Sequence, residues 1–276
     1  MKSNFAKRTI SGICFIGIML AGLLVNKYLY ALLVLFMIAV MLHEFYGMNM
    51  GGKLPVQRVL AIFTALCGFI LVFCVNSFHL PLHFAALIFV PLSAVMISSL
   101  YVKDTESFDL YSYIYTGILY IAVPLVLSNY IVFDREGNFN GLLMLCFFII
   151  IWASDVGAYC LGSLLGKNGK KLFPSISPNK SWAGYWGGLL FAVLAALIMS
   201  LTGLMKFPWY HSIILGAIMH VFGVFGDLFE SLWKRKCGVK DSGTIIPGHG
   251  GLLDRFDSSL FAIPIGAVYL LLVNLI

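Results

Sequence analysis

Long apolar runs separated by short polar segments fill the chain from residue 10 onward. A helix needs about 20 apolar residues to cross the hydrocarbon core of a bilayer. Nine segments approach that length, although polar residues interrupt the sixth and glycines the seventh. They cover residues 10–26, 28–48, 58–77, 81–102, 110–132, 140–165, 184–204, 209–233 and 257–276. The pattern predicts an all-α polytopic membrane protein with about nine transmembrane helices.

Basic residues gather on one side of these predicted helices. If the N-terminus is cytoplasmic, the outside segments contain only Lys27, Arg135 and Lys206, and the other fifteen of the 18 basic residues lie inside. Cytoplasmic loops carry such an excess of lysine and arginine. We therefore expect a multi-pass protein of the cell inner membrane with a cytoplasmic N-terminus. The first apolar run has no convincing cleavage site, so we expect it to be retained.

The composition supports a membrane protein and excludes several other classes. Hydrophobic residues make up 61% of the chain and charged residues 11%, with a mean hydropathy of +0.95. A soluble domain has about a quarter charged residues. The six cysteines show no paired spacing, which excludes a disulfide framework or a CxxC zinc site. The net charge of +6 lies mostly on the predicted cytoplasmic face, where anionic lipid or nucleotide could bind, and no separate basic domain exists to hold nucleic acid.

Carboxylates are concentrated in one window near the C-terminus. Of the 12 acidic residues, five lie between positions 227 and 257: Asp227, Glu230, Asp241, Asp254 and Asp257. An ionisable residue at the end of a membrane span is costly to bury and is therefore a functional candidate. The glycine-rich stretch 247–251 precedes the last predicted helix, where backbone N–H groups can converge on an anion. Its candidate ligands are His249, Gly250 and Gly251.

Acidic residues beside an anion-binding loop suit a magnesium ion that bridges them to phosphate. Asp227 and Asp254, at two helix ends, are the natural ligands, and Asp257 is a third candidate that could instead cap its helix. Glu230 could simply pair with Lys234 one turn later. The cations expected to neutralise phosphate are Lys234, Arg235, Lys240 and Arg255. The window predicts a metal–phosphate site at the cytoplasmic membrane surface.

The spacing of these residues resembles the signature of phosphatidate cytidylyltransferases, also called CDP-diacylglycerol synthases. The matching string is Ser231-x-x-Lys234-Arg235, Lys240-Asp241-x-Gly243 and Pro247-x-His249-Gly250-Gly251-x-x-Asp254-Arg255-x-Asp257. An upstream stretch is also similar to that family: Ala153-Ser154-Asp155-x-Gly157 and Ser177-Pro178-Asn179-Lys180-Ser181. The chain departs from the family pattern at Trp233, usually aliphatic or Phe, and at Ala183, where Glu or Gln is common. The first 150 residues carry no specific signal.

The resemblance implies that CTP and phosphatidic acid give CDP-diacylglycerol and pyrophosphate in a magnesium-dependent reaction. It implies catalytic roles for Asp227, Asp254, Lys240 and Arg255, and metal binding by Asp227, Asp254 and Asp257. Substrate binding would fall to Ser231, Lys234, Arg235, Asp241, His249, Gly250, Gly251, Lys180, Ser181 and Asp155. Structural roles compete at three places: a turn beside glycines for His249, helix capping for Lys180 and Ser181, and an exposed helix end for Asp155. Phosphatidate is ionised at neutral pH, so catalysis needs positioning and charge neutralisation rather than a strong base.

Two regions are expected along the chain. Residues 1–138 would form N-terminal transmembrane helices that provide a lipid chamber or dimer contacts. Residues 139–276 would form the catalytic domain, with cytoplasmic loops 166–183 and 234–256.

Several alternatives stay open at this level. It is open whether the site binds one or two metal ions and whether it binds an additional monovalent cation. It is also open whether the protein forms a homodimer among the membrane lipids. Two other functions compete: a CTP-dependent polyprenol or phytol kinase, and a cation-coupled transporter lined by acids such as Asp155, Asp227 and Glu44. Glu44, in the stretch His43-Glu44-Phe45-Tyr46-Gly47 at a helix end, could reach the cytidylyltransferase site but is not counted among its residues.

Overall fold

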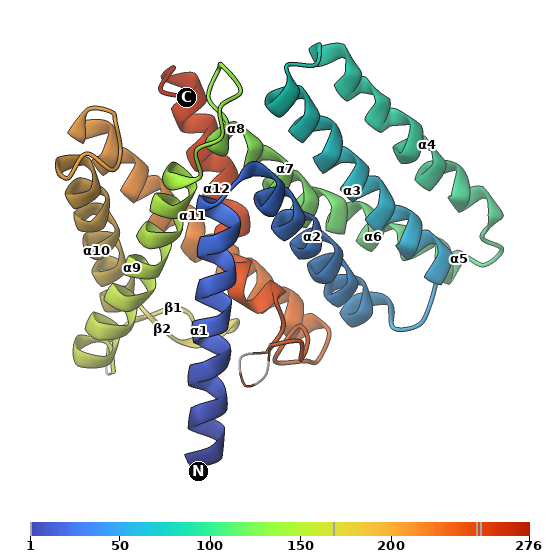
Figure 1. Ribbon diagram of the computed structural model, residues 1–276. Coiled ribbons are helices and arrows are strands. Elements are labelled where there is room, and N and C mark those ends of the chain that lie inside the picture. Colours follow the sequence, from blue (N-terminus) through green and yellow to red (C-terminus); the bar gives the residue numbers. More distant parts are fainter. Residues whose placement is uncertain (1, 168, 247, 249) are drawn as a thin grey trace. The chain divides into compact units, whose positions relative to one another are not determined.

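The computed structural model describes residues 2–276 apart from 168, 247 and 249, with side chains from Thr9 onward (Figure 1). Within these residues, 8 helical segments are long and apolar enough to cross a membrane. They are Lys27–Met50, Pro55–Phe78, Leu82–Tyr101, Thr105–Val132, Leu142–Leu165, Trp182–Leu201, Trp209–Lys236 and Leu253–Leu272, and the shorter apolar stretch Thr9–Leu24 precedes them. The predicted all-α polytopic class is confirmed. The count of nine spans and the orientation of the N-terminus stay predictions.

The chain divides into two compact units. The first contains Met1–Asn140 together with the loop Val239–Arg255. The second contains Gly141–Gly238 and Phe256–Ile276. The functional division into a region 1–138 and a catalytic region 139–276 stays a prediction.

The first unit is a set of helices of very different lengths. Their bounds are α1 (Lys2–Leu24), α2 (Lys27–Met50), α3 (Pro55–Phe78), α4 (Phe89–Ser98), α5 (Thr105–Asp109), α6 (Tyr111–Gly117), α7 (Val123–Leu127) and α8 (Asn129–Val132). Short 3₁₀ turns, Leu82–Ile88 and Ser99–Tyr101, flank α4, and the π-helical turn Ile118–Ala122 joins α6 to α7. Pro124 follows this turn and has no N–H to bond backward, so the helix widens there instead of continuing as α.

Aromatic side chains form the core of the first unit. The fully buried ring of Tyr30 on α2 contacts Phe69 on α3 and Phe133 and Phe139 beyond α8. Its hydroxyl lies 2.5 Å from Ser128 Oγ, which gives a polar group inside this apolar cluster a partner. The cluster joins segments that are far apart along the chain.

The second unit is built from long helices and one β-hairpin. Its elements are α9 (Leu142–Leu165), β1 (Lys171–Phe173), β2 (Ser177–Ser181), α10 (Trp182–Leu201), α11 (Trp209–Lys236) and the part of α12 (Leu253–Leu272) from Phe256 onward. The two strands are antiparallel, with Lys171 opposite Ser181 and Phe173 opposite Ser177. The predicted loop 166–183 therefore contains a hairpin that leads directly into α10 (Figure 1).

Glycines bring α9 and α10 into backbone contact. A Cβ atom on Gly157 of α9 would lie 2.6 Å from the carbonyl oxygen of Gly187 on α10. A Cβ atom on Gly187 would lie 2.7 Å from the carbonyl oxygen of Gly157. Only residues without a side chain fit these positions, as at many helix crossings in membranes. The contact fixes the end of the hairpin beside α9.

Candidate active site

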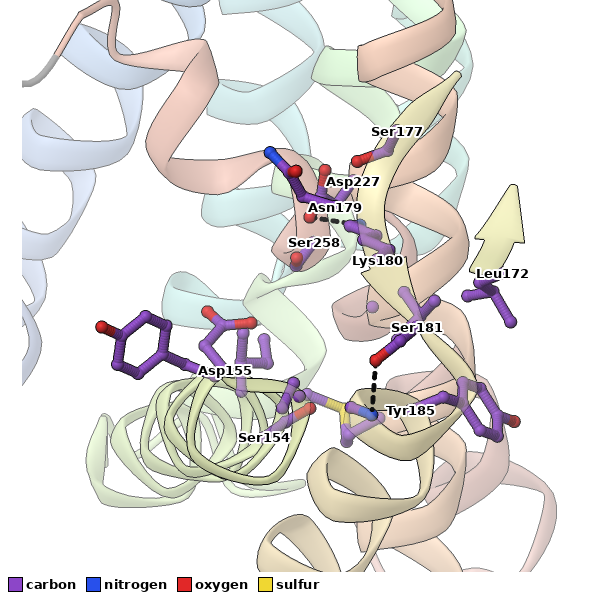
Figure 2. A pocket seen from close by; sticks show the side chains of 18 residues that line it. Ser154, Asp155, Leu172, Ser177, Asn179, Lys180, Ser181, Tyr185, Asp227 and Ser258 are labelled. Atoms are coloured by element: carbon purple, nitrogen blue, oxygen red, sulfur yellow. Dashed lines mark hydrogen bonds and ion pairs between the residues drawn. The ribbon is translucent and has the colours of Figure 1, made fainter. Parts of the chain in front are cut away.

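A cavity of about 390 Å³ lies in the second unit, where α9, the hairpin, α10 and α11 meet (Figure 2). One part of its wall is apolar and includes Ile151, Leu172 and Met219. The remaining wall carries polar and charged groups, among them Asp155, Asn179, Lys180, Ser181, Asp227 and Ser258. Three residues predicted from distant parts of the sequence, Asp155, Lys180 and Asp227, therefore line one cavity.

An ion pair between Lys180 and Asp227 dominates the charged side of this cavity. Lys180 Nζ on β2 contacts Asp227 Oδ2 on α11 (Figure 2). The exposed fractions of the two side chains are 25% and 33%, so both remain accessible from the cavity. Lys180 lies just before the N-terminus of α10, whose dipole repels a cation, and the carboxylate of Asp227 offsets that repulsion. The N-cap of α10 is the next residue, Ser181, and not Lys180.

Helical spacing on α11 brings residues one turn apart into contact. Ser231 Oγ donates to Asp227 Oδ1 at 3.2 Å, one turn apart on the same face. Lys234 Nζ lies 3.2 Å from Glu230 Oε2, and the Glu230 side chain is only 1% exposed. The predicted ion pair between Glu230 and Lys234 is confirmed.

Ser181 connects the hairpin to α10. Its hydroxyl accepts a hydrogen bond from the backbone N–H of Gly184 at 3.2 Å, so Ser181 is the N-cap of α10. The capping role considered for Ser181 is confirmed. The same buried residue also lines the cavity.

Asp257 is a further acidic residue of the second unit, near Asp227. It faces the charges of Asp227 on α11 and Lys234, and its Oδ1 accepts the N–H of Ser258 at 2.6 Å. Because α12 begins at Leu253, Asp257 lies beyond the first turn. The alternative in which Asp257 caps this helix is therefore wrong.

A second cavity, of about 430 Å³, lies within the loop of the first unit. Lys240, Asp241, Gly250 and Arg255 all line it, as the resemblance implied for a phosphate-binding loop. Gly250 has a φ of +86°, and a Cβ atom there would lie 2.8 Å from Asp254 Oδ2. Glycine is required at this position both by its left-handed backbone and by the nearby carboxylate.

Asp254 joins two parts of this loop, at Ser242 and at Gly251. Its Oδ2 accepts hydrogen bonds from Ser242 N at 2.9 Å, Ser242 Oγ at 3.0 Å and Gly251 N at 2.8 Å. Hydrogen bonds to an ionised group are stronger than neutral ones, so the three together fix the direction of the carboxylate. Asp254 is thus an anchor of the loop as well as a predicted metal ligand.

Glu44 of α2 is bound to the same loop and was missed as a site residue. Its side chain is 5% exposed, and its two carboxylate oxygens accept the N–H groups of Leu252 at 3.0 Å and Leu253 at 2.9 Å. The available signal was an acidic residue inside an apolar helix. Its partner lies 208 positions away, which no local pattern reveals.

Comparison with known proteins identifies the family. The model of the cytidylyltransferase family matches residues 6–273. A phosphatidate cytidylyltransferase of Staphylococcus saprophyticus is 33% identical over 273 residues, which cover 96% of this chain and 97% of that protein. The chain belongs to the cytidylyltransferase family. Other members named phosphatidate cytidylyltransferase include those of Bacillus subtilis, 42% identical over 164 residues, and Staphylococcus epidermidis, 38% identical over 181 residues. These two alignments cover 59% and 65% of both chains, less than two thirds of each relative.

The remaining predicted site residues lie at different places in the chain. Arg235 lies in the exposed last turn of α11, next to Lys236. Gly251 is part of the loop that Asp254 closes. His249 lies outside the described residues, so its role stays a prediction.

A magnesium ion would need hard oxygen ligands. Among the residues that the structure describes, no three His, Cys, Asp or Glu side chains gather in a way that could hold a metal. Magnesium is commonly bound by one or two carboxylates, with phosphate and water as its other ligands. Asp227 and Asp257 in one unit and Asp254 in the other offer such groups. The carboxylates Asp227 and Asp257 in the second unit are ligands of the kind that magnesium accepts, and so is Asp254 in the first unit. The pairing of Asp227 with Asp254 stays a prediction.

Proposed function

We propose that the protein transfers the cytidylyl group of CTP to phosphatidic acid, which gives CDP-diacylglycerol and pyrophosphate. The reaction would take place in the inner membrane, at a site that faces the cytoplasm. The names of the relatives support this substrate pair. The observation that carries the proposal is the Lys180–Asp227 pair at the wall of a cavity in a membrane-spanning unit.

This cavity suits a substrate with an anionic head and apolar chains. Lys180 is accessible and can exchange Asp227 for a phosphate oxygen, because both are charge-assisted partners of an ammonium group. The apolar side of the wall, with Leu172 and Val224, can contact the carbon atoms of a lipid. A phosphate at Lys180 would thus be held with its glycerol end beside apolar residues.

The second cavity suits the phosphate chain of a nucleotide. Lys240 and Arg255 contribute positive charge. Because Gly250 has no side chain, a phosphate can approach its backbone closely. Arg255 can bind two phosphate oxygens at once through its planar guanidinium group. Asp241 in the same wall would limit the number of anions held there.

The chemistry proposed is one in-line displacement. An ionised oxygen of phosphatidate forms a bond to the α-phosphorus of CTP, and the bond from that phosphorus to the bridging oxygen of pyrophosphate breaks. No proton has to be removed from the attacking oxygen, so the residues bind, orient and neutralise charge. Lys180, Lys240 and Arg255 would supply the cationic contacts.

Asp227, Asp254 and Asp257 are the residues that would hold magnesium. When bound, the ion would neutralise phosphate charge that develops during the displacement. Removal of magnesium with a chelator is expected to abolish turnover, and excess magnesium should restore it.

The deciding experiment uses the purified protein in detergent with magnesium, phosphatidic acid and α-labelled CTP. We expect label in a lipid product and release of one pyrophosphate for each lipid formed. Omission of phosphatidic acid should leave all label in water-soluble nucleotide.

Label that never enters lipid, with folded protein, would overturn the proposal. Transfer from γ-labelled CTP to a polyprenol would then establish a kinase. Failure of both reactions would direct attention to cation transport in proteoliposomes.

A further inference from the structure

Glu44 is a buried carboxylate that accepts hydrogen bonds from the loop Val239–Arg255. It projects from α2, and both its oxygens bind the N–H groups of Leu252 and Leu253, where α12 begins. The first N–H groups of a helix have no partner inside that helix. Glu44 therefore supplies the N-terminal cap of α12 from a distant part of the chain.

The loop is shaped around this carboxylate. A Cβ atom on Gly243 would collide with Glu44 Oε1 and would lie 2.8 Å from its Cδ and 3.0 Å from its Cγ. A Cβ atom on Gly251 would lie 2.8 Å from Glu44 Oε2. The side chain thus lies beside two glycines. A larger residue at Gly243 would displace Glu44, whereas one at Gly251 would first collide with Ser242 Oγ.

Glu44 and Asp254 act on the same short stretch of backbone. Asp254 accepts the N–H of Gly251, and Glu44 accepts the next two N–H groups, those of Leu252 and Leu253. Leu252 and Leu253 are themselves 5% and 0% exposed, so water cannot easily replace Glu44 as their acceptor. Loss of Glu44 would leave buried N–H groups unpaired and would free the loop to move.

We propose that Glu44 is a positioning residue: by capping α12 and filling the space between Gly243 and Gly251, it holds the loop that carries Lys240, Asp254 and Arg255 in its working conformation. The proposal rests on the proposed cytidylyl transfer for its kinetic consequence. Its structural part concerns only the first unit and holds for any reaction of this loop.

The first test compares Glu44→Gln with the wild-type protein in detergent. Glutamine retains one acceptor and turns its NH₂ group toward a backbone N–H. We expect kcat to fall between about tenfold and a hundredfold, the range caused by small misplacement of catalytic groups. The KM for phosphatidic acid should stay within about twofold, since the cavity of the second unit is untouched. Glu106→Gln is the matched control, because Glu106 is 81% exposed and pairs with Lys53 at the surface of the same unit.

A second readout needs no turnover. Hydrogen exchange of peptides that contain Leu252 and Leu253 should rise by about tenfold or more in Glu44→Gln, while exchange elsewhere in α12 changes less. Glu106→Gln should leave this exchange unchanged. Unchanged exchange in Glu44→Gln would overturn the inference even if activity fell.

A double-mutant cycle tests the contact itself. Gly243→Ala alone should lower kcat, because its methyl group displaces Glu44. In a Glu44→Ala background the same methyl group has space, so Gly243→Ala should add no further loss. Independent, multiplying losses would refute the proposed packing.

The two proposals fail in different ways. If the protein does not transfer cytidylyl groups, no variant shows activity, but faster exchange at Leu252 and Leu253 still supports the role of Glu44. If Glu44 has no positioning role, the wild type is active and Glu44→Gln matches it in kcat and in exchange.

Discussion

The two units contain acidic groups of different kinds. In the first unit, Glu44 and Asp254 bind backbone N–H groups and one hydroxyl. In the second unit, Asp227 pairs with Lys180, and Glu230 pairs with Lys234. Both arrangements satisfy buried or partly buried carboxylates, but their partners differ in mobility.

Because of this difference, the carboxylates of the first unit hold a fixed backbone geometry, whereas the Lys180–Asp227 pair can exchange partners. A backbone N–H cannot leave its carboxylate unless the loop unfolds, so Glu44 and Asp254 determine a conformation. A lysine side chain can rotate away from its carboxylate toward a phosphate at little cost when both are accessible. We therefore expect mutations in the first unit to affect structure and activity together, and mutations at the Lys180–Asp227 pair to affect activity alone.

Asp227→Asn should have the largest effect on turnover. The change removes a negative charge from the cavity but preserves the shape of the side chain, so kcat/KM should fall about a hundredfold or more. The melting temperature should change little, because the ion pair is a quarter to a third exposed and contributes about 0–1 kcal/mol. Labelled-lipid assays and thermal melts in detergent measure both quantities. Asp109→Asn, at an exposed position on α5, is the control. Near-normal activity of Asp227→Asn would remove Asp227 from the site.

Asp254→Asn should lower kcat/KM by up to about a hundredfold and also weaken the loop. One amide oxygen replaces a charged acceptor of three hydrogen bonds, which should lower the free energy of unfolding by about 1–3 kcal/mol. The same assay and melts apply, together with hydrogen exchange at Ser242 and Gly251. A variant that loses activity but keeps wild-type stability and exchange would show that the contrast between the two units is mistaken.

Gly187→Ala should destabilise the second unit without removing any charge. Its methyl group would lie 2.6 Å from Leu161 Cβ and 2.7 Å from the Gly157 carbonyl oxygen, so α10 must shift away from α9. We expect a loss of about 1–3 kcal/mol in the free energy of unfolding and a smaller fall in activity. Gly17→Ala in α1 is the control, since nothing lies within 4 Å of its Cβ position. Equal stability of the two variants would contradict the backbone contact.

Lys236→Ala should have the smallest effect. Lys236 is exposed at the end of α11, and surface changes of this kind shift energies by about 0.5 kcal/mol, or roughly twofold in kcat/KM. The same substitution at Lys180 should be far more damaging, because Lys180 lines the cavity. Similar losses in both variants would mean that general surface charge, rather than a defined pair, controls activity.

The membrane-spanning helices could be predicted because long apolar runs leave few alternatives. Contacts between residues one helical turn apart could be predicted equally well, as Asp227 with Ser231 and Glu230 with Lys234 demonstrate. Both depend only on hydropathy or on helical periodicity. These are local properties of the chain.

The hairpin and the role of Glu44 could not be predicted in the same way. Strand β2, Ser177–Ser181, has no alternation of apolar and polar residues, since its pairing partner and not its side chains makes it a strand. Glu44 depends on a contact across 208 residues. The alternative in which Asp257 caps its helix failed because the helix begins at Leu253, four residues before it. Long-range contacts and helix ends were the missing information.

The glycine contact between α9 and α10 also bears on how the protein is made. Two helices already surrounded by lipid gain nothing from expelling water, so their association depends on close van der Waals packing. Gly157 and Gly187 provide that packing without side chains. The helices can therefore insert one after the other and join within the bilayer. We therefore expect the hairpin that bears Lys180 to be fixed in the cavity once the two helices have joined.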